Sequence, residues 1–216
     1  MQIKQFVVNH YQVNCFLLWD EVTRRCAIVD PGAEASYEDE RIAQFIADNQ
    51  LTPTLILLTH AHVDHIAGLR QACTRYQLPV TLHQDGLKFL GQAEAYGSVM
   101  GFDVDNMRDL DTRLIADGDR LTLGDGTPDI IECRYVPGHC PGSMAFVLAA
   151  DKVVITGDAL FRGSIGRTDL PGGDYSQLIS SLRKQVLTLP DDYVVLPGHG
   201  DTTTIGEEHL YNGFLI

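Results

Sequence analysis

The chain has 216 residues, of which 44% are hydrophobic and 21% charged. These values are those of an ordinary globular protein, so they exclude disordered and fibrous classes, and the length predicts a single domain over residues 1–216. Acidic residues outnumber basic ones by 29 to 16, which gives a net charge of −13. An acidic surface repels phosphate backbones, so we expect no nucleic-acid partner.

Nothing in the sequence predicts a membrane or export segment. The longest apolar runs, residues 55–58 and 145–150, are far shorter than the ~18 residues of a transmembrane helix. The five cysteines are scattered, which disfavours a disulfide framework and fits a reducing compartment. We expect a cytoplasmic protein with no membrane partner, and we leave open whether it forms a homo-oligomer.

The first half of the chain predicts a meander of three strands, followed by alternating helices and strands. Ser36 with Asp39 three residues later predicts a helix N-cap, and apolar residues at helical spacing continue that helix to Asn49. The apolar run 54–58 predicts a strand buried on both faces, and a helix is expected over 66–76. The other strands predicted here are 1–8, 15–19, 26–29 and 80–82.

The second half is less regular. Residues 85–128 show no clear period, and beyond them the sequence predicts a helix that begins after Asp174 and ends before Pro190. Strands and helices mixed in this way indicate a layered α/β domain. The strands expected in this half are 130–136, 145–148, 153–155 and 193–196.

The segment 59–65, Thr-His-Ala-His-Val-Asp-His, is the strongest functional signal. Imidazole suits zinc and other first-row metals, and carboxylate suits harder ions. Alternate residues of an extended stretch point the same way, so His60 and His62 can bind one ion while Asp64 and His65 turn toward a second. A polar loop with exposed histidines is the alternative interpretation.

Three further strand ends carry the same chemistry. Pro137-Gly138-His139, Thr156-Gly157-Asp158 and Pro197-Gly198-His199 each follow an apolar run. Ligand sites of open α/β sheets gather beyond strand ends, and glycine permits sharp turns and close backbone approach. Each of these residues alone could be a surface or capping residue, but together they predict one site.

This order of residues resembles the metallo-β-lactamase-fold hydrolases, whose signature T-H-x-H-x-D-H is followed by an isolated His, an Asp and a final His. The resemblance covers nearly the whole chain and implies a four-layer αβ/βα sandwich, with two mixed sheets between helices. It also implies two divalent metal ions bridged by Asp158. The implied ligands are His60, His62 and His139 for the first ion, and Asp64, His65 and His199 for the second.

Such a centre implies metal-assisted hydrolysis. The ions, zinc first and iron or manganese as alternatives, lower the pKa of a bridging water to about 7, and the resulting metal-bound hydroxide attacks a carbonyl carbon. Asp64 can orient that hydroxide, so Asp64 and Asp158 are the candidate catalytic residues. The sequence has no G-x-S-x-G nucleophile elbow, and Cys140 is expected to be a packed neighbour of His139.

Residues 157–169 resemble the corresponding loop of glyoxalase II-type thioesterases, and residues 197–204, with Glu207 and Asn212 beyond them, resemble the tail of the small bacterial glyoxalase II-like proteins. This resemblance implies a thioesterase that cleaves hydroxyacyl thioesters such as lactoylglutathione, a small anionic substrate. A thiolate leaves easily, because the thiol pKa is about 8.5, so no strong general acid is needed. Arg167 falls where the family has a basic residue near the substrate carboxylate, although a surface salt bridge with Asp169 is an equal alternative.

Two other functions stay open. The loop G-D-A-L…G-R-T-D also resembles persulfide dioxygenases, in which two histidines and the aspartate hold one iron; here these would be His60 or His62 with His139 and Asp158. The loop continues as Leu-Pro-Gly-Gly, as in the thioesterase branch. A non-catalytic metal-binding module is the third alternative. The number of metal ions per chain separates the two enzyme classes: two ions favour the hydrolase and a single iron favours the dioxygenase.

Overall fold

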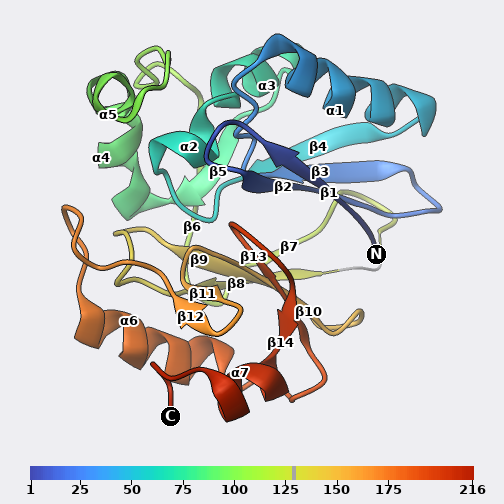
Figure 1. Ribbon diagram of the computed structural model, residues 1–216. Helices are drawn as coiled ribbons and strands as arrows, with labels where there is room; N and C mark the ends of the chain where they lie inside the picture. Colours follow the sequence, from blue (N-terminus) through green and yellow to red (C-terminus); the bar gives the residue numbers. More distant parts are fainter. Residues whose placement is uncertain (128–129) are drawn as a thin grey trace.

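The computed structural model describes residues 1–127 and 130–216. Within these residues, two six-stranded mixed sheets face each other, and helices lie on the outer side of each sheet (Figure 1). This is the four-layer sandwich expected from the sequence. Across the described ranges, every helix is too short or too polar to span a bilayer.

The first sheet has the strand order β1-β2-β3-β4-β5-β6. Its first three strands pair antiparallel, as the predicted meander requires, and the others add in parallel. The strands are β1 (Gln2–Val8), β2 (Val13–Trp19), β3 (Arg25–Val29), β4 (Thr52–Leu57), β5 (Val80–His83) and β6 (Thr112–Ile115).

The second sheet has the strand order β14-β13-β10-β9-β8-β7. Each pair of neighbouring strands in it is antiparallel, except the parallel pair β10 and β13. A short hairpin of β11 (Leu160–Phe161) and β12 (Ser164–Ile165) follows β10. The strands of the second sheet are β7 (Arg120–Leu121), β8 (Ile131–Tyr135), β9 (Met144–Leu148), β10 (Val153–Gly157), β13 (Val194–Pro197) and β14 (Thr203–Thr204).

The outer layers are amphipathic helices. Ile42 and Ile46 of α1 pack against the first sheet, and Leu178 and Leu182 pack against the second. Two short helices, α4 and α5, precede β6. The helical segments are α1 (Ser36–Asp48), α2 (Val63–Ile66), α3 (Leu69–Tyr76), a 3-10 turn (Gln84–Gly86), α4 (Leu87–Leu90), α5 (Ala93–Met100), α6 (Tyr175–Ser181) with its π-helical extension (Leu182–Val186), and α7 (Ile205–Tyr211).

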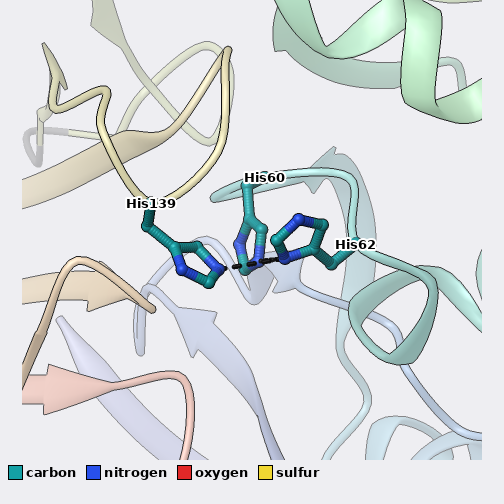
Figure 2. A group of neighbouring side chains, drawn as sticks. All are labelled: His60, His62 and His139. Carbon is teal, nitrogen blue, oxygen red and sulfur yellow. Dashed lines mark hydrogen bonds between the residues drawn. The ribbon is translucent and has the colours of Figure 1, made fainter. Parts of the chain in front are cut away.

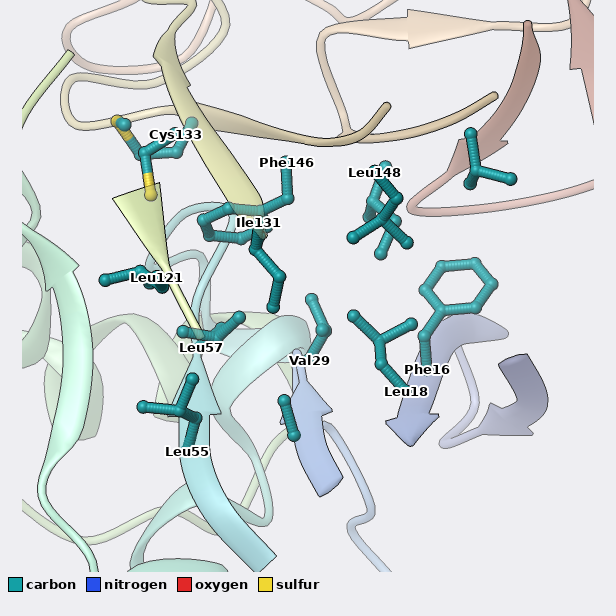
Figure 3. Packing of buried hydrophobic residues seen from close by; sticks show 14 of the residues in the cluster. Phe16, Leu18, Val29, Leu55, Leu57, Leu121, Ile131, Cys133, Phe146 and Leu148 are labelled. Atoms are coloured by element: carbon teal, nitrogen blue, oxygen red, sulfur yellow. The ribbon is translucent and has the colours of Figure 1, made fainter. Parts of the chain in front are cut away.

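Apolar side chains from both sheets fill the space between them (Figure 3). Leu18 and Leu57 come from the first sheet and Ile131 and Phe146 from the second, and none of them is more than 1% exposed. The burial of each such side chain stabilises the folded state by about 1.5–3 kcal/mol. This core holds the strand ends of both sheets in a fixed relation to one another.

Two helix predictions are wrong in detail. The N-cap of α1 is Ala35, one residue before Ser36, and Glu38 rather than Asp39 accepts the backbone N–H of Ala35 at 3.2 Å. The helix predicted over 66–76 is divided into α2 and α3. The break falls at Gly68, where a Cβ would lie 2.5 Å from the carbonyl oxygen of Ala33, so a tight tertiary contact fixes the chain there.

The strand predicted over 54–58 is also only partly as expected. β4 begins at Thr52, and only its second half is buried. Residues 85–127, which show no clear period, contain α4, α5, β6 and β7.

Candidate metal centre

The seven predicted ligands meet where the loops of the two sheets face each other. His60 and His62 follow β4, and Asp64 and His65 lie in α2 directly after them. The other three, His139, Asp158 and His199, follow β8, β10 and β13 of the second sheet. Strand ends from both sheets therefore supply the cluster.

Three histidines form the first group (Figure 2). Nδ1 of His62 lies 3.1 Å from Nε2 of His60 and 2.9 Å from Nε2 of His139. Each of the three offers one ring nitrogen, and these nitrogens lie within 4.8 Å of one another. Three imidazole nitrogens at these separations are a donor set that suits a first-row divalent metal.

Asp64, His65 and His199 form the second group. Nε2 of His199 lies 3.2 Å from Oδ2 of Asp64 and 3.3 Å from Nε2 of His65. Asp158 lies between the groups: its Oδ2 is 3.7 Å from Nε2 of His139, and its Oδ1 is 3.3 Å from Nε2 of His65. One carboxylate thus contacts histidines of both groups.

The outer ring nitrogens of three histidines face acceptors. Nδ1 of His139 is 2.8 Å from the carbonyl oxygen of Arg167, and Nδ1 of His199 is 2.9 Å from that of Tyr11. A carbonyl oxygen only accepts, so Nδ1 carries a proton and Nε2 is the ring nitrogen that faces the cluster. Nδ1 of His65 faces a carboxylate oxygen of Asp30 at 3.0 Å with the same result. Such outer partners orient metal-binding histidines.

Asp30 is a buried partner of the cluster that the sequence analysis missed. It is 1% exposed, and it accepts hydrogen bonds from the backbone N–H of Thr59 at 2.7 Å and from the Thr59 hydroxyl at 2.6 Å. The hydroxyl oxygen can then accept from Nδ1 of His60, 3.1 Å away. Asp30 directly follows β3, so the strand-end rule that singled out the other ligands could have found it.

Burial keeps the first group neutral. It lowers the pKa of His60 well below its usual value and that of His62 to about 3, and the neighbouring histidines add to both shifts. Burial also lowers the pKa of His139, although Asp158 opposes it. Neutral imidazole is the form that binds a metal.

Carboxylates reverse this effect in the second group. Burial lowers the pKa of His65, but Asp158 and Asp64 outweigh it and raise the pKa well above its usual value. Burial also lowers the pKa of His199, but its hydrogen bond with Asp64 and the charge of Asp158 raise that pKa above its usual value. Burial raises the pKa of Asp158, yet His65 and His199 hold it below its usual value, so this carboxylate stays ionised. Among the described residues, its buried Oδ1 has no hydrogen-bond partner.

A family model described as the metallo-beta-lactamase superfamily matches residues 8–199. This chain belongs to that superfamily. Two bacterial relatives, each 39% identical, align with all of this chain and 98% of their own length: a probable metallo-hydrolase YqgX of Bacillus subtilis and the hydroxyacylglutathione hydrolase GloC of Haemophilus influenzae.

Solved structures of the superfamily share the fold. BLEG-1 B3 metallo-beta-lactamase superposes with a TM-score of 0.88 at 34% identity over 99% of both chains. TTHA1623, described in a di-iron-bound form, gives 0.86 at 35% identity over 98% of this chain and all of its own. ETHE1 from Myxococcus xanthus gives 0.78 at 29% identity over 99% of this chain and 84% of its own.

Two glycines let the metallo-beta-lactamase ligand loops come together. A Cβ on Gly198 would lie 2.1 Å from Oδ1 of Asp158 and 2.8 Å from Cε1 of His65. Gly138 has φ +128°, and a Cβ there would lie 2.2 Å from the backbone nitrogen of Leu178. Both positions therefore require a residue without a side chain.

A cavity of about 350 Å³ opens over the cluster. Arg167 lines it and also forms the predicted ion pair with Asp169, with both N···O distances 2.8 Å. Cys140 is fully buried, and burial raises the pKa of its thiol to about 12, so it is not a ready nucleophile. Sequence analysis missed several apolar lining residues, among them Tyr11, Phe89, Tyr96 and Met100.

Proposed function

We propose that this metallo-hydrolase is a thioesterase of the glyoxalase II type that cleaves hydroxyacyl thioesters such as lactoylglutathione. The observation that carries the proposal is the position of Asp158, whose carboxylate contacts histidines of two separate ligand groups. The 39% identity with the hydroxyacylglutathione hydrolase GloC supports the substrate class.

The donor set fits two divalent ions. His60, His62 and His139 would hold the first, Asp64, His65 and His199 the second, and Asp158 would touch both. The ring nitrogens that face the cluster and the buried Oδ1 of Asp158, which accepts no hydrogen bond from the described residues, support this assignment, because buried polar atoms without hydrogen bonds are costly. Zinc, iron and manganese all suit such ligands, and TTHA1623 is described in a di-iron-bound form. When bound, such ions ionise a water near neutral pH and polarise a carbonyl oxygen.

The protein's own groups would bind and orient the reactants. Burial raises the pKa of Asp64, but His65 and His199 hold it below its usual value, so Asp64 stays ionised and can accept a proton of the attacking water in a hydrogen bond. Arg167 would bind a carboxylate of the substrate at the cavity mouth. A thiolate needs no strong acid to leave, and no residue of the cavity is required to protonate it.

The test begins with protein stripped by a chelator and reloaded separately with zinc, ferrous iron or manganese. We expect hydrolysis of lactoylglutathione only after loading. His62→Ala should remove metal and activity together, whereas His209→Ala, which changes an exposed histidine on α7, should keep both. A His62→Ala variant that hydrolyses the thioester at the wild-type rate would show that the proposal is wrong.

The persulfide dioxygenase alternative predicts a different metal content and a different reaction. It needs one iron, so it leaves Asp64, His65 and His199 without a role, although the structure brings their ligand atoms within 4.8 Å of one another. A single iron per chain with oxygen uptake on a persulfide would support that alternative. We also propose a cytoplasmic location, since all five cysteines are free and buried.

A further inference from the structure

We propose that helices α4 and α5 form a pocket that selects hydroxyacyl thioesters with a large apolar acyl side chain, such as a phenyl group. This inference rests on the proposed thioesterase function and names its preferred substrate. Phe89 of α4 and Ala93, Tyr96 and Met100 of α5 line the cavity on this side.

The apolar wall directly adjoins the ligand cluster. The ring of Phe89 lies 5.8 Å from that of His62, centroid to centroid, and 6.2 Å from that of Tyr96, with which it is nearly parallel. The Tyr11 hydroxyl, at 3.4 Å from the carbonyl oxygen of Met100, connects this wall to the β1–β2 turn. An acyl group whose carbonyl is at the cluster therefore has an aromatic surface within reach.

The cavity also carries a positive charge outside the ligand cluster. Five clustered residues line it (His62, Asp64, His139, Asp158 and His199), and apart from these Arg167 is the one charged side chain among the described lining residues. The thiol half of a glutathione thioester bears the carboxylates, so it is expected beside Arg167. The acyl half, whose carbonyl is at the cluster, then has Phe89 and Tyr96 within reach.

The cavity as a whole, which also takes in the ligand cluster and Arg167, is larger than a lactoyl group. A cavity of about 350 Å³ falls within the range of small-molecule sites, and a lactoyl group offers it only one methyl group. A phenyl group in the same position would bury far more apolar surface and contact the two rings favourably. The walls thus favour a bulky acyl side chain over a methyl group.

The experiment compares two glutathione thioesters that differ only in this group, lactoyl (methyl) and mandeloyl (phenyl). We expect kcat/KM of the metal-loaded enzyme to be at least about tenfold higher for the mandeloyl thioester. A single methylene in an apolar pocket already changes kcat/KM by about 10- to 200-fold, and phenyl differs from methyl by more than that. Tyr96→Ala should lower the ratio of the two kcat/KM values toward one, and Tyr96→Phe should preserve the ratio. Val99→Ala, an 81% exposed position on the same helix, is the matched control and should leave the ratio unchanged.

Binding of uncleavable thioethers separates this proposal from the proposed function. The probes are S-(2-hydroxy-2-phenylethyl)glutathione and S-(2-hydroxypropyl)glutathione, measured by calorimetry on metal-loaded and stripped protein. Tighter binding of the phenyl probe that is lost in Tyr96→Ala supports the pocket even if no thioester is cleaved, an outcome that would end the thioesterase proposal alone. Equal binding of both probes, or a preference that survives Tyr96→Ala, would overturn the pocket.

Discussion

Asp30 contacts His65 on the side of the imidazole that faces away from the other ligands. Its Oδ2 lies 3.0 Å from Nδ1 of His65, and both side chains are at most 1% exposed. The same carboxylate accepts two hydrogen bonds from Thr59, so one acid fixes parts of both ligand groups.

Replacing Asp30 by asparagine should weaken metal binding. The backbone at Asp30 has φ +51°, which asparagine tolerates, so the change tests the side chain rather than the turn. An amide cannot accept all three hydrogen bonds, and loss of such an outer partner lowers metal affinity by about 10- to 100-fold. Competition with a chromophoric chelator measures the affinity. The exposed Asp125→Asn is the control, and equal affinities in both variants would contradict the role of Asp30.

A methyl group on Gly198 should disrupt the second ligand group. In Gly198→Ala the new carbon would meet Oδ1 of Asp158 and Cε1 of His65, so both must move. A misplacement of about 1 Å can cost about 100-fold in rate, and we expect such a loss in kcat together with a lower metal content. Gly213→Ala adds the same methyl in open space and should behave as wild type. Full metal content in Gly198→Ala would refute the close approach.

Arg167→Ala should raise KM for anionic thioesters while kcat stays the same. The guanidinium is exposed and already paired with Asp169, and exposed ion pairs contribute about 0.2–1 kcal/mol, so the rise in KM should not exceed about fivefold. A thioester of the same acid with uncharged N-acetylcysteamine is the control. A KM that is unchanged, or that rises equally for both thiols, would exclude Arg167 from carboxylate binding.

Acidification should remove the two ions in separate steps. Burial holds the pKa of His62 at about 3, so protons do not compete for the first group near neutral pH. Asp158 and Asp64 raise the pKa of His65 despite its burial, so protons compete for the second group as the pH falls. Metal content after equilibration between pH 7.5 and pH 5 should therefore show a plateau near one ion per chain. A single step from two ions to none would contradict this order.

The clustering of the ligand side chains could be predicted, because each of them is marked by its immediate sequence neighbours. His139, Asp158 and His199 each follow a strand and a glycine, so the residue type and its place on a sheet edge were both visible in the sequence. The superfamily and the four-layer fold were confirmed. Asp30 was not predicted as part of the site although it too follows a strand, because its contacts with Thr59 and His65 are created by the fold.

The apolar wall could not be predicted for a different reason. Helices α4 and α5 have four and eight residues, too few for a clear helical period, so Phe89 and Tyr96 gave no signal of a shared face. The break between α2 and α3 depends on the approach of Gly68 to Ala33, a contact between distant residues. Arg167 was given two alternative roles, and the ion pair with Asp169 does not exclude the other role.

The most direct test of the paired metal centre is elemental analysis of the wild-type chain after loading with excess zinc and desalting. The structure places two groups of three ligands around a shared carboxylate, so we predict two zinc ions per chain. One ion or none per correctly folded chain would contradict the account.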